Sequence, residues 1–250
     1  MEKYLIPNLS KACHVLKELA KHEQGMSAAE IAQDLSIPRT TAFRILRTLV
    51  HEGLVEKAGR VFHAGPGLVE IGSRVLSQVR VREQAIPVLQ RLTRETGETA
   101  QLAVLSGLHS LILEVCDSPN PIRVASRPGT LADLHCSATG KVFLAYLYGD
   151  QLETILPSLE LHRRTANTIT DLKRLEVEVR HIQQQGYAVD DEEYYEGARC
   201  LAAPVWQSGM QVVASVGITA TVQRFVRGRI PEVARVVVAG ASELSRFLGG

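Results

Sequence analysis

Arginine and threonine side chains gather along one short segment near the N-terminal end of the chain. Residues 39–51, RTTAFRILRTLVH, repeat apolar residues at the spacing of a helix, with an apolar face formed by Phe43, Leu46, Leu49 and Val50. The other face carries Arg39, Thr40, Thr41, Arg44 and Arg47. Guanidinium groups bind phosphates and guanine edges, and a helix fits the major groove of DNA. This pattern therefore predicts a helix that contacts DNA.

The segment before this helix has the features of a helix-turn-helix. Residues 28–35 have helical apolar spacing, with Ser27 at the N-cap position and Glu30 three residues later. Residues 36–38, Ser-Ile-Pro, end that helix, because proline has no N–H to donate and suits the start of a new helix. We expect Ser27 and Arg47 to contact the DNA backbone. The residues expected to face base edges and phosphates are Arg39, Thr40, Thr41 and Arg44.

A short hairpin with a basic tip follows the second helix. Residues 54–57 and 61–63 predict two strands around the turn at 58–60. Lys57 and Arg60 of this hairpin are expected to reach phosphates or the minor groove. Two amphipathic helices with exposed arginines also occur in domains that never bind DNA, but the basic hairpin directly after them favours a winged helix-turn-helix.

The distribution of charge agrees with this interpretation better than the total does. The whole chain has a net charge of only +1, whereas residues 1–65 hold nine Lys and Arg against seven acidic residues. Five of those nine lie on the second helix and the hairpin. Local charge decides phosphate contacts, so the near-neutral total does not exclude nucleic acid.

Cysteine spacing and hydropathy point to a cytoplasmic protein. The four cysteines, Cys13, Cys116, Cys136 and Cys200, form no CxxC pair, and this is typical of a reducing compartment. The first ten residues lack the apolar core of a signal peptide, and no apolar run reaches the length of a membrane helix. We expect no membrane association.

The pattern divides the chain into three parts. Residues 1–65 form the DNA-binding domain, 66–81 a linker helix, and 82–250 an α+β domain with strands expected at 99–105, 111–116, 122–124, 201–206 and 212–219. The linker has an apolar stripe made of Leu68, Ile71, Val75, Leu76 and Val79. Because the first domain has little surface left to cover this stripe, we expect a second copy of the chain to do so.

Two later motifs, taken with the winged helix, carry a family resemblance. Residues 134–141 read LHCSATGK, and residues 186–205 read GYAVDDEEYYEGARCLAAPV. In their order and spacing, these stretches resemble the IclR family of bacterial transcription regulators over essentially the whole chain. The resemblance implies a GAF-like C-terminal domain that binds a small effector, a dimer or tetramer, and repression or activation of transcription from a double-stranded DNA operator.

The resemblance also implies an effector site. Matching positions in family members with carboxylate effectors line the pocket, and here they are Ala138, Thr139, Asp190, Cys200, Gly217 and Thr219. Small residues at 138–140, Gly140 included, would let an anion approach N–H groups at a helix start. Some relatives have serine at both late-strand positions, so Gly217 is expected to remove a donor and to add room.

Other readings of these motifs point elsewhere. Gly140-Lys141 lacks the remaining residues of a phosphate-binding loop, since His135 and Val142 stand where glycine and Ser or Thr are required. The His135-Cys136 pair, with Cys200 and Asp190 elsewhere in the chain, could form a metal or nucleophile site, but buried cysteine more often serves as a small apolar residue. Asp190 could bind a ligand hydroxyl or cap a loop. We expect no catalytic residue, metal ion or cofactor.

These observations favour a ligand-responsive regulator that binds palindromic operators as a homo-oligomer and takes a small organic acid as effector. The alternative is a metabolic enzyme whose N-terminal domain is an interaction module. The lack of a catalytic constellation in the sequence counts against the enzyme.

Overall fold

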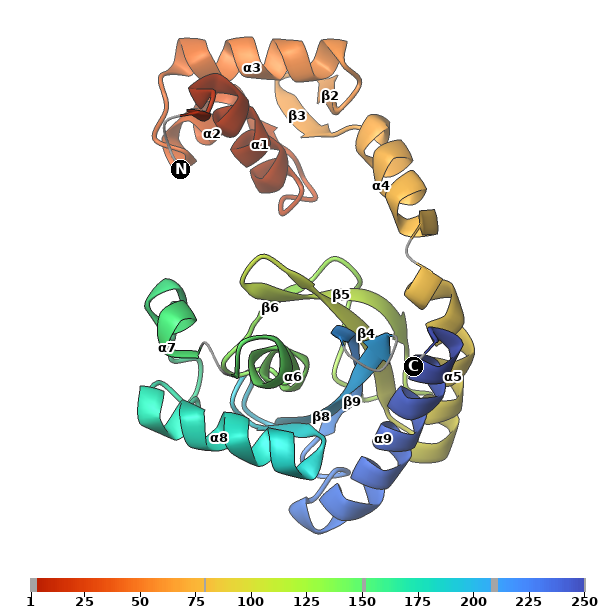
Figure 1. Ribbon diagram of the computed structural model, residues 1–250. Helices are drawn as coiled ribbons and strands as arrows, with labels where there is room; N and C mark the ends of the chain where they lie inside the picture. The colour runs from red at the N-terminus through yellow and green to blue at the C-terminus, as the bar shows by residue number, and fades with distance from the viewer. Residues whose placement is uncertain (1–3, 79, 150–151, 208–210, 250) are drawn as a thin grey trace. The chain divides into compact units, whose positions relative to one another are not determined.

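The computed structural model describes residues 4–78, 80–149, 152–207 and 211–249. The chain divides into two compact units, Met1–Val79 and Arg80–Gly250. Among the described helices, none combines the length and the apolar character needed to cross a bilayer. The fold class expected from the sequence, α+β behind a winged helix-turn-helix, is confirmed by the order of the elements (Figure 1).

Three helices and a small sheet make up the compact core of the first unit. The helices are α1 (Pro7–Leu19), α2 (Ala28–Asp34) and α3 (Arg39–His51). The antiparallel sheet has the order β1-β3-β2, with β1 (Met26–Ser27), β2 (Val55–Ala58) and β3 (Val61–Ala64). Val15, Ile31, Leu46 and Phe62 are fully or almost fully buried between them. The hairpin β2–β3 is the wing that the sequence predicts.

The expected start of α2 is present in atomic detail. Ser27 Oγ accepts a hydrogen bond from Glu30 N at 3.3 Å, and Ser27 N donates to the Glu30 carboxylate at 2.7 Å. This reciprocal capping box fixes where α2 begins and therefore where the turn into α3 lies. Ser36 in that turn adopts the left-handed backbone conformation, with φ of 52°.

The buried face of α3 differs from the sequence-based expectation at two positions, since Ala42 and Ile45 are buried in place of the exposed Phe43 and the half-buried Val50. Its buried side chains are Ala42, Ile45, Leu46 and Leu49. Phe43 was expected in the core and is instead 47% exposed, so that expectation is wrong. Each residue turns a helix by about 100°, and the small Ala42 takes the position that faces α1 and α2. Phe43 is thereby turned toward the outside of the helix.

The first unit ends with α4 (Pro66–Gln78), which covers most of the expected linker. Leu68 is half-buried, whereas Val69 and Ile71 are 69% and 54% exposed. The remaining members of the expected stripe, the side chains of Val75 and Leu76 and all of Val79, lie outside the described residues. The first helix of the second unit, α5 (Arg80–Thr96), follows.

A six-stranded antiparallel sheet forms the centre of the second unit, in the order β6-β5-β4-β9-β8-β7. Its strands are β4 (Thr99–Ser106), β5 (His109–Cys116), β6 (Leu131–Asp133), β7 (Ala188–Asp191), β8 (Ala198–Gln207) and β9 (Gln211–Thr221). The strand expected at 122–124 is wrong, because those residues lie in an irregular loop with Ile122 exposed. That loop is hydrogen-bonded to β4 through Val124 and Ser126 and lines a cavity described below.

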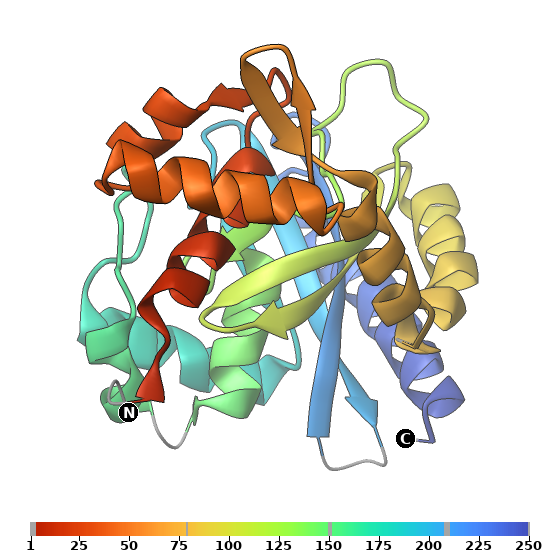
Figure 2. The ribbon, with the colours of Figure 1, turned by 90° about the horizontal axis from the view of Figure 1, so that it is seen from above.

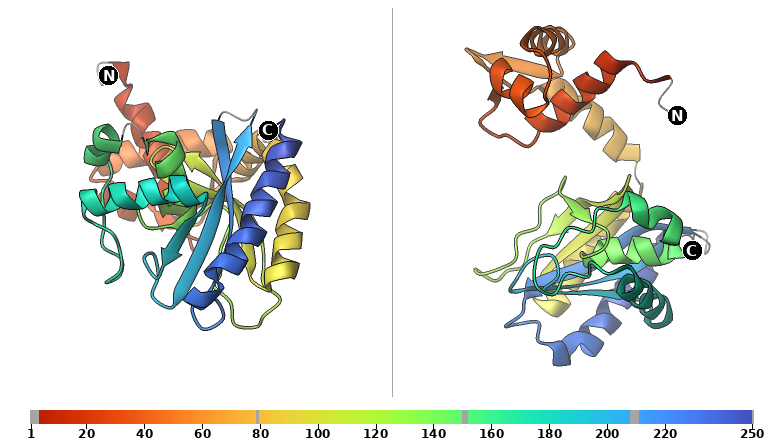
Figure 3. Two further views of the ribbon diagram at one scale, coloured as in Figure 1. Left: turned by 60° about the horizontal axis from the view of Figure 1, so that its bottom comes forward. Right: turned by 90° about the vertical axis from the view of Figure 1, so that its left-hand side faces the viewer.

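Helices cover both faces of this sheet. Figures 2 and 3 show α5 and α9 (Ile230–Phe247) side by side along one face. The other face is covered by α6 (Ala138–Leu147) and α8 (Leu172–Gln185). Shorter helical turns are α7 (Leu152–Ile155), η3 (Leu156–Ser158) and η4 (Arg227–Arg229). The side with α6 and α8 holds a core that includes Phe143, Leu175 and Ile182.

Candidate functional site

The side of α3 opposite its buried stripe forms a basic surface. Arg39, Thr40, Arg44 and Arg47 are exposed there, and Thr41 is half-buried. Lys57 and Arg60 are exposed on the wing. Ser27 lies at the start of α2, where both its hydroxyl and its backbone N–H are bonded to Glu30. The fold thus brings the arginines of α3 onto one exposed side of a single helix.

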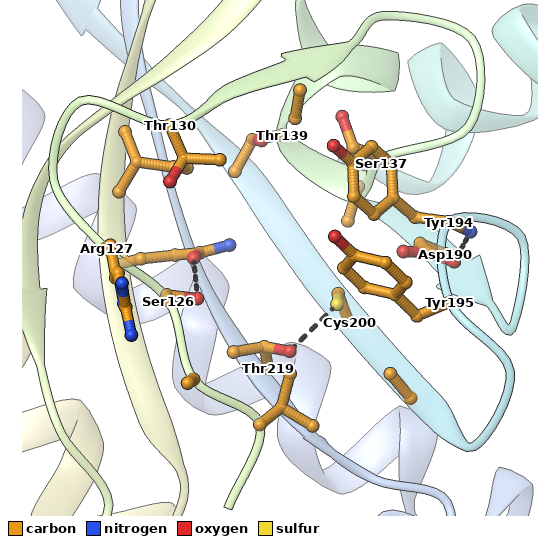
Figure 4. Close-up of a pocket in the computed structure, with 17 residues that line it drawn as sticks. Ser126, Arg127, Thr130, Ser137, Thr139, Asp190, Tyr194, Tyr195, Cys200 and Thr219 are labelled. Atoms are coloured by element: carbon orange, nitrogen blue, oxygen red, sulfur yellow. Dashed lines mark hydrogen bonds between the residues drawn. The ribbon is translucent and has the colours of Figure 1, made fainter. Parts of the chain in front are cut away.

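A second site, in the C-terminal unit, is a cavity of about 260 Å³. It lies between the open part of the sheet, the start of α6, the loop at 124–130 and the loop that joins β7 to β8 (Figure 4). The expected residues that line it are Ala138, Thr139, Asp190, Cys200 and Thr219. Segments more than 80 residues apart in the sequence therefore meet around one cavity.

Strand register places two of these side chains next to each other. Cys200 on β8 pairs with Thr219 on β9, which in turn pairs with Thr99 on β4. The Cys200 thiol donates a hydrogen bond to Thr219 Oγ1 at 3.1 Å. On the α6 side, the buried Ser110 hydroxyl donates to Thr139 Oγ1 at 2.8 Å. The wall of the cavity thus joins a mainly apolar surface to a few polar side chains that are already bonded to one another.

Gly140 and Gly217 are not among the residues that line the cavity. A Cβ atom at Gly140 would come within 2.6 Å of the Asp133 carbonyl oxygen, and Gly140 N already donates to Ser137 Oγ at 3.1 Å. A Cβ atom at Gly217 would overlap the carbonyl oxygen of Leu201. The expectation that Gly217 adds room is therefore wrong, because the neighbouring strand occupies that space.

Asp190 at the end of β7 lines the cavity and also closes a loop. Its side chain is only 2% exposed, and its Oδ1 accepts hydrogen bonds from the backbone N–H groups of Glu193 and Tyr194 at 2.7 and 3.2 Å. Burial raises the pKa of Asp190 to about 6. Of the two roles that the sequence left open, the structure contains the loop cap, and the same carboxyl group also interacts with the Cys200 thiol.

Sequence reasoning missed the side chains that the loops contribute. These are Gln101, Ser126, Arg127, Thr130, Tyr194 and Tyr195. Ser126 Oγ donates to Gln101 Oε1 at 2.7 Å, and the two tyrosine rings meet edge to face at 4.8 Å. Figure 4 shows the tyrosines across the cavity from Ser126 and Arg127. The sequence signal that could have indicated this part of the cavity is the pair of adjacent tyrosines directly after the four acidic residues 190–193.

Lys141, in the first part of α6, is buried in an ion-pair network. It is 1% exposed, and its Nζ lies 2.6 Å from the Glu193 carboxylate and 2.8 Å from that of Glu178. Burial opposes the ammonium charge, but the two carboxylates outweigh it and raise the pKa of Lys141. The amine is therefore committed to structure, which agrees with the failed match to a phosphate-binding loop.

The His135-Cys136 pair lies with Asp133 in a cluster whose possible ligand atoms are all within 4.8 Å of one another. Arg164 Nε lies 2.6 Å from the Asp133 carboxylate, and burial raises the pKa of the Cys136 thiol well above its usual range. Metal ligation requires thiolate and an unblocked carboxylate. The arrangement among these described residues favours a structural role for Cys136 as a buried thiol.

The burial of Asp190 predicts a pH effect on stability. A raised pKa means that stability is lost as the pH rises from about 4 through about 6, because the folded state then gives up a proton that it holds better than the unfolded chain. Asp190→Asn keeps an acceptor for the loop N–H groups but does not titrate. Because a pKa near 6 changes stability by about 2–3 kcal/mol over this range, the melting temperature of the variant relative to wild type is expected to rise by about 5–10 °C between pH 4 and pH 7.

Fluorescence of Trp206, the single tryptophan, reports on the second unit and suits this measurement. Asp171→Asn, which alters the exposed N-cap of α8, is the control for an aspartate outside the cavity. If the difference in melting temperature between Asp190→Asn and wild type stayed constant from pH 4 to pH 7, the raised pKa assigned to Asp190 would be contradicted.

Comparison with known proteins gives the chain a family. Residues 8–59 match the IclR helix-turn-helix domain, and residues 73–246 match the bacterial transcriptional regulator IclR C-terminal domain. The HTH-type transcriptional regulator BhcR of Paracoccus denitrificans is 34% identical over 239 residues, which cover 95% of this chain and 85% of that protein. The transcriptional repressor IclR of Escherichia coli is 28% identical, with 98% and 91% covered.

A solved structure extends the similarity to three dimensions. The crystal structure of the Thermotoga maritima IclR has 31% sequence identity and a TM-score of 0.74, with 98% of this chain and 99% of that chain covered. The match runs through the winged helix, the linker region and the domain that holds the cavity. On both domain matches and on overall similarity, the chain belongs to the IclR family of bacterial transcriptional regulators.

Proposed function

We propose that this protein binds a palindromic DNA operator as a homodimer or tetramer, and that a small organic acid bound in the cavity changes its affinity for that operator. The single observation that carries the proposal is that one chain joins an exposed basic helix to a cavity whose mainly apolar wall carries several hydrogen-bonding side chains. We further propose that it acts in the cytoplasm, with 1–65 as the DNA-binding domain, 66–81 as the linker and 82–250 as the effector domain.

The DNA-binding half of the proposal rests on α3 and the wing. Arg39, Thr40, Thr41 and Arg44 are proposed to contact base edges and phosphates, and Ser27 and Arg47 the backbone. Lys57 and Arg60 of the wing are proposed to reach a phosphate or the minor groove. The rigid capping of α2 and the packed face of α3 support this, because a reading helix must be held firmly to discriminate between bases.

The effector half rests on the chemistry of the cavity. Ala138 and Thr139, in the first turn of the ten-residue helix α6, line it, so an anionic group could meet the positive end of that helix. Thr219, Cys200 and Asp190 offer hydrogen-bonding groups on the sheet side. A volume of about 260 Å³ lies just below the ~300–1,000 Å³ that is usual for pockets that hold drug-sized ligands. These features suit a compact organic acid that also carries a hydroxyl or carbonyl group.

The enzyme alternative gains no support from these features. Of the reactive side chains that the motifs offered, Cys136 is buried and Lys141 is held between two carboxylates. Cys200 and Asp190 do line the cavity, but the thiol is bonded to Thr219 and the carboxylate to loop N–H groups. We therefore propose that the protein is not an enzyme and that its cavity binds a signal.

A thermal-shift screen of organic, sugar and aromatic acids tests the effector half directly. A ligand at ~100 times its dissociation constant is expected to stabilise the protein by ~2.7 kcal/mol. Anisotropy of a labelled operator, measured with and without each hit, then tests the regulatory half. Hits that stabilise the protein but turn over to product would favour the enzyme.

Cys200→Leu is expected to abolish the response to effector while it changes ligand-free DNA binding by less than about twofold. The larger side chain would project into the cavity and remove the thiol that bonds Thr219. If Cys200 were ordinary core, overpacking would destabilise the domain by ~1–3 kcal/mol instead. Cys116→Leu is the matched control, because Cys116 is a half-buried cysteine of β5 that does not line the cavity. A folded Cys200→Leu variant with a normal effector response would refute this site.

Light scattering at micromolar concentration is expected to give a dimer or tetramer. Val69 and Ile71 are exposed on α4, and a second copy of that helix is the simplest cover for them. Ile71→Lys is expected to weaken self-association at least tenfold, whereas Val177→Lys, on the exposed side of α8, is the control. A monomer of 27.4 kDa, with and without DNA, would overturn this expectation.

A further inference from the structure

Phe43 is a large apolar side chain on the exposed side of α3. It is 47% exposed, although the same helix buries Ala42, Ile45, Leu46 and Leu49. Figure 1 shows α3 at the edge of the first unit, with α1 and α2 on one side of it. Single exposed apolar residues are common and need no explanation. What distinguishes Phe43 is the set of residues beside it.

Cations stand on both sides of this ring position. Arg39 and Arg47 precede and follow Phe43 by four residues, which places each about 40° from it around the helix axis. Arg44 follows directly, and all three arginines are exposed. A partner for this side of α3 must therefore offer negative charge at its edges and an apolar group between them.

Duplex DNA has that combination in its major groove. Phosphates border the groove, and the 5-methyl group of thymine is the apolar group that bases present there. Contacts between thymine methyl groups and apolar side chains, phenylalanine included, are a recognised mode of direct readout. A protein partner would supply the apolar group but would not account for three exposed guanidinium groups around it.

We propose that Phe43 reads sequence by contacting the 5-methyl group of a thymine in each half of the operator. The inference rests on the proposed function, since it requires α3 to lie in the major groove. It adds a specificity residue to the arginines: they bind phosphates and polar base edges, and Phe43 distinguishes thymine from bases without a methyl group. This contact would give Phe43 a function at an exposed position where the side chain contributes little to the core.

The test removes the methyl group from the DNA and the ring from the protein separately. The full-length protein first selects an operator from random duplex, and each thymine of the half-sites is then replaced by deoxyuridine, which pairs identically but lacks the methyl group. For wild type, replacement at one position in both half-sites is expected to weaken binding about tenfold, from a three- to fourfold loss per methyl group. Phe43→Ala is expected to bind the two duplexes equally.

Two further variants separate the explanations. Phe43→Leu keeps an apolar contact and should retain part of the thymine preference. Val177→Ala removes an exposed apolar side chain of the other unit and should leave both affinity and preference unchanged. If wild type selects no operator, the proposed function fails. If wild type selects an operator but Phe43→Ala still loses as much affinity on the deoxyuridine duplex as wild type does, only the assignment of Phe43 is overturned. The same holds if Phe43→Ala changes the oligomeric state instead of the thymine preference.

Discussion

Lys141→Met is expected to destabilise the second unit by about 3–5 kcal/mol, the range for breaking a buried ion pair by removal of one partner. The variant keeps the length of the side chain but leaves Glu193, which is 6% exposed, without its cation. Glu178 is less affected, because a quarter of its side chain still meets solvent. Chemical denaturation followed by Trp206 fluorescence measures the loss.

The deficit of this variant should depend on pH in a defined direction. Burial already raises the pKa of Glu193 to about 7 with Lys141 present, and removal of the ammonium raises it further. A carboxyl with a raised pKa loses its contribution to stability as the pH rises through that pKa, so the deficit is expected to be larger at pH 8 than at pH 5. Lys173→Met, at an exposed position on α8, should change stability by less than about 0.5 kcal/mol. A Lys141→Met loss below about 1 kcal/mol would contradict the network.

Arg44→Ala is expected to weaken operator binding about tenfold or more. Arg44 is exposed in the middle of α3, on the basic surface, and a bidentate contact with a base is worth ~1–3 kcal/mol. In a symmetric dimer the contact is lost in both half-sites, and the two losses combine. Gel-shift titration against a selected operator gives the two dissociation constants.

Arg74→Ala is the charge-matched control for this effect. Arg74 is exposed on α4 and pairs with Glu70 at 2.8 Å, so its removal changes the net charge equally without touching α3. The operator affinity of Arg74→Ala is expected to fall by less than about threefold. Equal losses for the two variants would mean that the basic surface acts only through overall charge, and that α3 does not read the operator.

The first unit could be predicted closely from the sequence because its signals are local. Ser27 and Glu30 mark the start of α2, and Pro38 precedes α3 by one residue. The error at Phe43 has a physical cause. Periodicity finds that one side of a helix is apolar, but with apolar residues at 42, 43, 45, 46, 49 and 50 it cannot decide which of them complete the buried stripe.

The cavity could be predicted only in part. Cys200 and Thr219 sit on strands, and the family resemblance points to them. Tyr194 and Ser126 lie on loops whose course depends on distant contacts, such as the cap that Asp190 provides. Lys141 illustrates the same limit, because its partners are 37 and 52 residues away in the sequence. Neither spacing nor periodicity carries that information.

The central claim is that occupancy of the cavity controls binding of DNA by α3. The most direct test is the dissociation constant of the full-length protein for its selected operator, measured by fluorescence anisotropy without ligand and at saturation with an acid that stabilises the protein. A fivefold or larger change is predicted for wild type, within the usual range of allosteric coupling, and no change for Cys200→Leu. Operator affinity that is the same at zero and saturating ligand would contradict the account.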